Sequence, residues 1–118
     1  MGAVKLVYIA GKFRGPTAWD VAENIRAAER YGFRVAQLGA MPLIPHANTA
    51  HFNGTITDQF WIDGTLELLK RCDGAVFIPG WLESVGARAE HAYAEKNGMA
   101  IFGAGHFDSG DLERWIRS

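Results

Sequence analysis

The chain has 118 residues and a formal net charge of −1, with basic and acidic residues interspersed along it. This length suits one domain around one core, and the mixed charge excludes the polybasic surface that a nucleic acid polymer or an anionic membrane would attract. Cys72 is the single cysteine, which excludes an internal disulfide and a thiolate metal cluster and makes a reducing cytoplasm the expected compartment.

The first strand is predicted at Val4–Ala10, where an apolar run is ended by Gly11. The run from Met1 to Ala10 is too short for a signal peptide or a membrane span and Lys5 interrupts it, so neither is expected. The next residues, Lys12 to Pro16, predict a loop that carries two cations.

A long helix is predicted to open at Pro16 or Thr17 and to close at Gly39. Its apolar residues recur at helical spacing: Val21, Ile25, Ala28, Val35 and Leu38. A break near Tyr31-Gly32, with Phe33–Gln37 as a strand, is the competing interpretation. The long helix is preferred because Met41–Pro45 then supplies the next strand.

Residues His46 to Thr55 have the composition of a long polar loop. Thr57 or Asp58 then caps a second helix, whose apolar stripe contains Ile62, Leu66 and Leu69. A buried third strand is predicted at Gly74–Ile78, because the segment is short, continuous and apolar and ends at Pro79-Gly80.

A third helix is predicted from the Ser84 cap to about Lys96, with Asn97-Gly98 as its stop. A fourth strand at Met99–Phe102, a loop at Gly103–Ser109 and a short helix at Asp111–Arg117 complete the chain. The alternation of strands and helices favours an α/β fold with three layers, in a single domain over residues 1–118. We expect a doubly wound parallel sheet of four to five strands, flavodoxin-like or Rossmann-like, with the loops after the first and third strands at one edge.

The turn after the third strand carries the clearest chemical signal. Its helix-start amides face outward at the carboxyl end of a strand, a place that phosphate prefers. Gly86 and Glu90 are four residues apart, so they share a helix face with open space beside the carboxylate. The alternative is that Ser84 only caps the helix and Glu90 is a solvated glutamate.

The loop after the first strand is a second candidate ligand site. Gly11 and Gly15 permit a tight backbone, while Lys12 and Arg14 place cations beside it. Arginine in a glycine loop suits recognition of a phosphate by paired hydrogen bonds. The segment lacks the Walker and dinucleotide patterns, and an ordinary turn remains the alternative.

Three sequence blocks together resemble the nucleoside 2-deoxyribosyltransferase superfamily, in particular its small uncharacterised members and the 2'-deoxynucleoside 5'-phosphate N-hydrolases. The resemblance covers roughly Lys5 to Phe102, in order and in spacing. The blocks are Tyr8-Ile9-Ala10-Gly11-Lys12-Phe13-Arg14-Gly15, then Cys72-Asp73-Gly74-Ala75-Val76, then Pro79-Gly80-Trp81 with Ser84, Gly86 and Glu90, followed by Ala94 and Gly98.

The resemblance implies roles for the matching residues. Glu90 takes the place of the family's nucleophile, which attacks the anomeric carbon of the sugar, and Tyr8 matches a tyrosine near it. Ser84 matches the serine with which the monophosphate hydrolases hold the 5'-phosphate. The loop residues Gly11, Arg14 and Gly15 match those that hold sugar and phosphate, which favours a nucleotide ligand over a free nucleoside.

The chain departs from these relatives at the residue that protonates the leaving base. They carry an aspartate eight residues before the position of Asp73, and this position is Thr65 here. Asp63 lies roughly 200° around the helix from it, so it substitutes only if the helix is distorted. Asp58 and His46 are further candidates, the histidine because it titrates near neutral pH.

The remaining signals are weaker. The four histidines are too scattered for a metal signature, and neither a metal nor a cofactor is expected. Trp81, in the site loop, either stacks on a base or covers the helix start. Several large aromatic side chains suggest an oligomer interface: Phe52, Phe60, Trp61 and Trp115.

The expected function is cleavage of the N-glycosidic bond of a deoxynucleoside 5'-monophosphate or a similar nucleotide, with a glutamate as nucleophile. Such an enzyme is a glycosidase or a deoxyribosyltransferase. The alternative is a nucleotide-binding module of the same fold without activity. The expected partner is a small molecule, with no nucleic acid polymer and no membrane, and the chain is expected to form a homodimer or a higher homo-oligomer.

Overall fold

The computed structural model describes residues 3–52 and 54–118. Within them, four strands form one sheet in the order β2-β1-β3-β4, and all neighbouring strands are parallel. The strands are β1 (Leu6–Ala10), β2 (Met41–Leu43), β3 (Gly74–Phe77) and β4 (Ala100–Phe102). The helices are α1 (Ala18–Leu38), α2 (Pro45–Asn48), α3 (Asp58–Lys70), the single 3-10 turn η1 (Trp81–Glu83), α4 (Val85–Lys96), α5 (Gly105–Asp108) and α6 (Asp111–Arg117).

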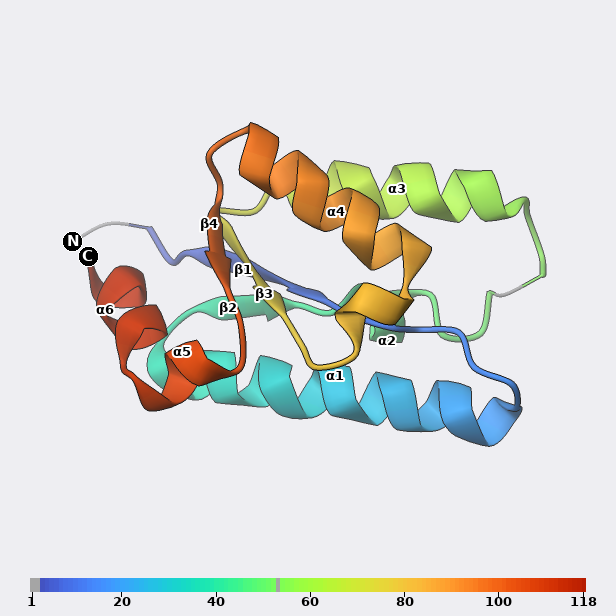
Figure 1. Ribbon diagram of the computed structural model, residues 1–118, viewed down its shortest axis with the longest axis horizontal. Helices are drawn as coiled ribbons and strands as arrows, with labels where there is room; N and C mark the ends of the chain where they lie inside the picture. The colour runs from blue at the N-terminus through green and yellow to red at the C-terminus, as the bar shows by residue number, and fades with distance from the viewer. Residues whose placement is uncertain (1–2, 53) are drawn as a thin grey trace.

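Helices cover both faces of the sheet, with α1 on one face and α3 and α4 on the other (Figure 1). The alternation along β1 matches this arrangement. Val7 and Ile9 pack in a core with residues of α1 and α6, whereas Tyr8 and Ala10 pack on the opposite face with Leu69 of α3. The predicted α/β fold with a parallel sheet is therefore confirmed.

Helix α1 runs unbroken to its end, so the alternative strand at Phe33–Gln37 is wrong. Thr17 caps its start in a reciprocal capping box with Asp20, and Gly39 ends it with φ +109°. Gly32 is tolerated inside this helix because the chain packs closely there. A Cβ at Gly32 would lie 2.5 Å from Cδ1 of Ile44.

Several predicted boundaries shift. Strand β1 begins at Leu6 rather than Val4, and β2 ends at Leu43, because Pro45 opens the short helix α2. The predicted loop at His46–Thr55 therefore begins within a helix; its Asn53 lies outside the described residues.

Two short helical segments were not predicted from the sequence. Turn η1 precedes the Ser84 cap of α4, and α5 lies within the segment expected as a loop at Gly103–Ser109. Helix α5 is held by tertiary packing, since the ring of Phe107 lies 5.6 Å from that of Tyr31 on α1. The short terminal helix is confirmed as α6.

The strand order creates a crevice at one end of the sheet. Strand β1 is central, and the chain leaves it through α1 to β2 on one side and later returns through α3 to β3 on the other. Open parallel sheets bind ligands at such a reversal, at the carboxyl ends of the strands. In the described part of the chain, no helix has both the length and the apolar character needed to cross a membrane.

Candidate functional site

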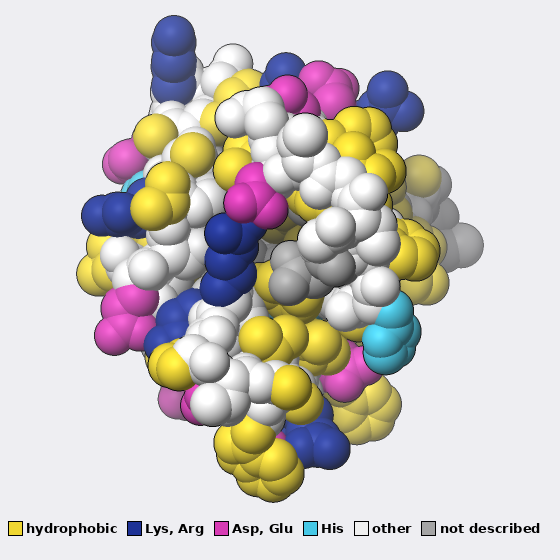
Figure 2. Space-filling view, turned by 90° about the vertical axis from the view of Figure 1, so that its right-hand side faces the viewer, with side chains coloured by type: hydrophobic (Ala, Val, Ile, Leu, Met, Phe, Trp, Pro, Cys, Tyr) yellow, Lys and Arg dark blue, Asp and Glu magenta, His cyan; other side chains and the backbone are white. Residues whose placement is uncertain are grey.

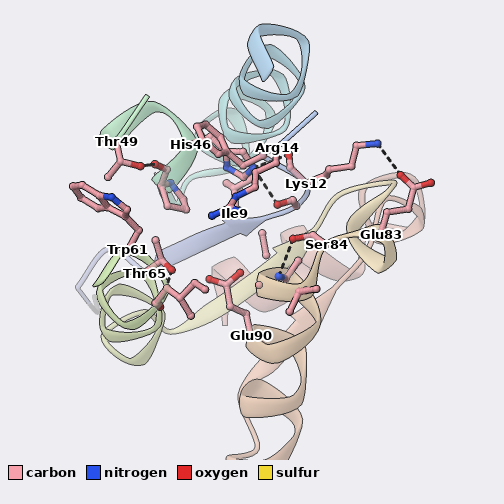
Figure 3. Close-up of a pocket in the computed structure, with 18 of the residues that line it drawn as sticks. Ile9, Lys12, Arg14, His46, Thr49, Trp61, Thr65, Glu83, Ser84 and Glu90 are labelled. Carbon is pink, nitrogen blue, oxygen red and sulfur yellow. Dashed lines mark hydrogen bonds and ion pairs between the residues drawn. The ribbon is translucent and has the colours of Figure 1, made fainter. Parts of the chain in front are cut away.

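A cavity of about 640 Å³ opens at the carboxyl ends of β1 and β3. It is walled by the loop after β1, by α2, by one face of α3, and by the start of α4 (Figure 3). The predicted site residues that line it are Tyr8, Gly11, Lys12, Arg14, Gly15, His46, Ser84, Gly86 and Glu90. The arginine loop and the carboxylate of α4 thus share one cavity.

Glu90 is a buried carboxyl group on the cavity wall. Its side chain comes from the second turn of α4, and the residue is only 8% exposed. The hydroxyl of Tyr8, from β1, donates a hydrogen bond to its Oε2. Burial raises the pKa of Glu90 to about 7, although the bond from Tyr8 acts in the opposite direction.

No cation among the described residues forms an ion pair with Glu90. Within the described ranges, its polar partner is the phenol of Tyr8, which stays neutral because burial and the neighbouring carboxylate raise the pKa of Tyr8. The group is therefore not locked in a structural salt bridge. A perturbed, uncompensated carboxyl group in a cavity is typical of a functional site.

The start of α4 provides an anion-binding geometry beside Glu90. The Oγ of Ser84 accepts a hydrogen bond from the backbone N–H of Ala87 at 3.1 Å, which confirms the predicted cap. Gly86 faces open space, since the nearest atom to a Cβ built there is Ser84 Oγ at 3.9 Å. Both residues line the cavity, so an anion at the helix start would meet free N–H groups.

The loop after β1 is held tightly against the sheet. A Cβ at Gly11 would lie 2.4 Å from Cγ1 of Ile78, and one at Gly15 would lie 2.5 Å from Cβ of Asp20. Neither glycine has a positive φ, so the backbone conformation does not require glycine at these positions. The close packing does, because a side chain would collide with these neighbours. Asn24 also fixes the loop through its side-chain amide, which donates to the carbonyl of Phe13 at 3.0 Å.

Both loop cations lie at the cavity mouth and pair with carboxylates of other elements. Lys12 Nζ lies 2.8 Å from Glu83 of η1, and Arg14 lies 2.9 Å from Asp58 at the start of α3. All four side chains are substantially exposed. Figure 2 faces this end of the molecule and shows basic and acidic groups side by side among apolar patches.

His46 supports the loop after β1 through its ring nitrogen. It is 5% exposed, and its Nε2 lies 3.2 Å from the carbonyl oxygens of both Gly11 and Lys12. Burial lowers the pKa of His46. The ring is therefore neutral near pH 7, and its N–H donates to the backbone carbonyls. This arrangement argues against the predicted role of His46 as a proton donor.

The structure does not bring Asp63 into the site. Its carboxylate accepts a hydrogen bond from Gln59 at 2.8 Å on the exposed side of α3. The helix is regular from Asp58, so Asp63 stays on the opposite side from Thr65, which lines the cavity beside Tyr8. Of the candidate acids on α3, only Asp58 lies in the cavity wall.

Trp81 is also outside the cavity, against the expectation that it stacks on a base. Turn η1 directs its ring onto Phe77 at 5.1 Å and into a parallel stack with His91, with centroids 4.5 Å apart and 16° between the planes. The tryptophan packs between β3 and α4, which agrees with the alternative that it covers the helix start.

Trp61 lines the cavity, although the sequence predicts it for an oligomer interface. It lies on the stripe of α3 that faces the cavity, and its ring stacks on Phe52. The helical spacing could have indicated this position, because Asp58, Ile62 and Thr65 recur at intervals of three and four residues on the same face of α3 as Trp61. Two others of the predicted interface aromatics, Phe52 and Phe60, are about half exposed; the oligomer stays a prediction.

Other groups outside the cavity have structural roles. Cys72 is buried, as expected, and burial raises the pKa of its thiol to about 11. Among the described residues there is no cluster of three or more His, Cys, Asp and Glu side chains arranged to hold a metal ion.

The fold and the cavity define a parallel α/β protein with its candidate ligand site at the reversal of strand order. Comparison with known protein families identifies the family of the chain. Residues 5–103 match the family described as a domain of unknown function, DUF4406, and the chain belongs to this family. The match spans all four strands and every cavity-lining residue. No curated protein matches the chain.

Proposed function

We propose that the protein cleaves the N-glycosidic bond of a deoxynucleoside 5'-monophosphate or a closely similar nucleotide, with Glu90 as nucleophile. The observation that carries the proposal is the buried Glu90–Tyr8 pair in the wall of a cavity that also contains the start of α4. It accords with the resemblance of the sequence blocks to nucleoside 2-deoxyribosyltransferases and nucleotide N-hydrolases.

The chemistry matches the groups present. Breaking the bond between sugar and base builds positive charge on the sugar, which a carboxylate stabilises or captures as a glycosyl ester. An oxygen of Glu90 attacks the anomeric carbon, the carbon–nitrogen bond breaks, and the base leaves with the electron pair and takes a proton from solvent. Water then hydrolyses the ester, which restores the carboxylate and releases deoxyribose 5-phosphate.

The anionic end of such a substrate has partners in the same cavity. Ser84 and the start of α4 offer hydrogen-bond donors, and Lys12 and Arg14 offer positive charge. Because each cation is paired with a carboxylate, the phosphate would take the place of Glu83 or Asp58 when it binds. Hydrolysis is preferred to transfer because nothing in the sequence identifies a second site for a base.

A second function, a nucleotide-binding module without activity, is favoured by one observation. Thr65 stands where the related enzymes carry an aspartate, and its hydroxyl donates to the carbonyl of Ile62 at 3.1 Å. A threonine cannot protonate a leaving base near neutral pH. The leaving group would then depend on solvent for its proton.

Product analysis tests the proposal. The purified protein is incubated with each of the common deoxynucleoside monophosphates, and free base is quantified by chromatography. The parent releases base and Glu90→Gln does not. Glu95→Gln is the matched control, since this carboxylate lies on the same helix but is exposed and outside the cavity. Thermal stabilisation by nucleotides in both parent and Glu90→Gln, with no base release by either, would establish the binding module instead.

A further inference from the structure

The carboxylates at the cavity mouth are engaged in ion pairs. Asp58 lies 2.9 Å from Arg14, and its side chain is 60% exposed. Glu83 lies 2.8 Å from Lys12. A carboxylate in an ion pair is ionised and only accepts hydrogen bonds, so neither group is placed to protonate a leaving base.

The neutral polar groups of the cavity wall direct their protons toward other protein groups. The Nε2 of His46 donates to backbone carbonyls of the loop after β1 at 3.2 Å. The hydroxyl of Thr65 donates to the carbonyl of Ile62 at 3.1 Å, and that of Tyr8 donates to Glu90 itself. Within the described part of the chain, a base that leaves a sugar at Glu90 therefore meets no side chain with a proton to give.

The need for such a proton depends on the charge of the base. A neutral base leaves as an anion unless an acid protonates it, and a positioned acid accelerates such a step about 100- to 10,000-fold. A base that already carries a positive charge leaves as a neutral molecule and needs no proton. A buried carboxylate without an accompanying acid suits the second kind of base.

The charge of the cavity favours the same kind of base. Among the described residues, its lining contains three carboxyl groups and two cations, namely Asp58, Glu83, Glu90, Lys12 and Arg14. The two ion pairs cancel, so an ionised Glu90 leaves an excess of one negative charge. Because Glu90 is only 8% exposed, water screens its charge weakly, and a positive ring beside it would compensate that charge.

The wall formed by α3 offers a surface for such a ring. In the view of Figure 3, Glu90 lies between Thr65 of α3 and Ser84 of α4. A sugar at Glu90 with its phosphate at the start of α4 therefore directs its base toward α3. Trp61 and Ile62 line the cavity on this helix, and aromatic side chains attract cations.

We propose that the cavity takes nucleotides whose base carries a positive charge, such as an N-alkylated purine or a pyridinium ring. The inference rests on the proposed function, because it names the substrate class of the same site. An oxygen of Glu90 bonds to the anomeric carbon, and the carbon–nitrogen bond breaks. Its electron pair neutralises the ring, so the base departs without a proton. Water then hydrolyses the ester and releases one proton to solvent.

The first test compares 7-methyl-2'-deoxyguanosine 5'-monophosphate with deoxyguanosine 5'-monophosphate, which lacks only the methyl group and the positive charge. Free base is quantified by chromatography, and release by Glu90→Gln, which includes spontaneous release, is subtracted. The methylated nucleotide should lose its base at least about 100-fold faster, the least that a missing acid is worth. Nicotinamide mononucleotide is the second cationic substrate, and its cleavage would extend the class from alkylated purines to pyridinium rings.

Thr65→Asp tests whether the missing acid is the cause. The new carboxyl group lies in the cavity wall on α3, and it should raise release from the unmethylated nucleotide about tenfold or more relative to release from the methylated one. Thr65→Asn is the matched control, because it has the same size without an acidic proton and should keep the ratio of the parent. Should Thr65→Asp not fold, the comparison of substrates by the parent decides alone.

The outcomes separate this inference from the proposed function. Similar rates for the methylated and unmethylated nucleotides would overturn the preference for a cationic base and leave Glu90 as nucleophile. An unchanged ratio in folded Thr65→Asp would overturn it as well, because a missing acid would not then limit the reaction of the neutral base. If the parent releases a base from none of these nucleotides, the proposed function falls with the inference.

Discussion

The hydroxyl of Tyr8 donates a hydrogen bond to Oε2 of Glu90 in the cavity wall. The tyrosine is 1% exposed and comes from the centre of the sheet, so the phenol is fixed in position. Because this neutral donor is the carboxylate's partner, Glu90 ionises in a buried place without an adjacent cation. The balance between burial and this one hydrogen bond therefore controls the protonation of the proposed nucleophile.

Base release should increase with pH through about 7. The attacking group is the carboxylate, and burial raises the pKa of Glu90 to about 7. In Tyr8→Phe the carboxylate loses its donor, so the pKa of Glu90 rises further and the ascending limb of the profile moves to higher pH. The measurement is kcat/KM for base release as a function of pH. A limb at the same pH in both proteins would mean that Glu90 does not control the reaction.

The same carboxyl group should limit stability above neutral pH. The unfolded chain releases the Glu90 proton near 4.5 and the folded chain near 7, so stability is lost as pH rises between these values. Over that window the loss is roughly 3 kcal/mol, at about 1.4 kcal/mol per pKa unit. Glu90→Gln removes this dependence and gains stability relative to the parent as pH rises.

Urea unfolding of the parent and of Glu90→Gln, at pH values on either side of this window, measures the difference. Glu95→Gln serves as control because its carboxylate is exposed, and it should follow the parent at both pH values. Equal pH dependence in Glu90→Gln and the parent would show that the carboxyl group has an ordinary pKa.

Gly86→Ala should block the ligand without harming the fold. The added methyl group enters the cavity, where the nearest atom other than those of its chain neighbours and the helix backbone is Ser84 Oγ at 3.9 Å. Alanine favours a helix over glycine by up to about 1 kcal/mol, so the variant is at least as stable as the parent. Base release should fall roughly 10- to 100-fold because the reacting groups are displaced.

Gly64→Ala is the matched control for that substitution. Gly64 lies within α3, and a Cβ built there meets no atom within 4 Å apart from its chain neighbours and the backbone of its own helix. It does not line the cavity. Both variants should gain stability in thermal unfolding, while only Gly86→Ala loses activity. Unchanged base release in Gly86→Ala would place the substrate away from the start of α4.

The sequence predicted the part of the site that depends on local structure. Ser84 is a helix cap by residue type, and the spacing of Gly86 and Glu90 places them on one face of α4. The meeting of this helix with the arginine loop followed from the parallel order of strands, since both segments leave the carboxyl ends of β1 and β3. Such features require only residue type, spacing and the direction of strands.

What could not be predicted depends on tertiary packing. No local pattern shows that η1 turns Trp81 onto His91, because the 3-10 turn is set by how the chain leaves β3. The role of His46 likewise depends on carbonyl oxygens 34 and 35 residues away in sequence. Helical geometry alone predicts that Asp63 points away from Thr65, whereas the ion pair of Asp58 with Arg14 depends on the tertiary fold.

Glu83→Gln should strengthen the binding of nucleotides but not of nucleosides. Glu83 lies 2.8 Å from Lys12 and holds this cation at the cavity mouth, and the same pairing lowers the pKa of Glu83. Without the carboxylate, Lys12 is free to meet the phosphate. Because exposed ion pairs are weak, the expected gain in affinity is about two- to fivefold.

Calorimetric titration with a deoxynucleoside monophosphate and with the corresponding nucleoside measures this selectivity. Glu67→Gln is the control, since it breaks an exposed ion pair with Lys70 that lies outside the cavity. The gain in Glu83→Gln should shrink as salt is added. Equal gains for the nucleotide and the nucleoside would show that Glu83 acts on some other part of the ligand.

Gly11→Ala should destabilise the chain through a steric clash with Ile78, the residue that follows β3. The added Cβ would lie 2.4 Å from Cγ1 and 2.8 Å from Cδ1 of Ile78, a residue that is 3% exposed. Overpacking of this kind costs about 1–3 kcal/mol. Ile78→Ala removes both atoms and itself costs about 2–5 kcal/mol, because it leaves a cavity. The double variant should lose less stability than the two single losses combined, since each change relieves the other. Additive losses in urea unfolding would show that the loop moves away from Ile78 instead of being held against it.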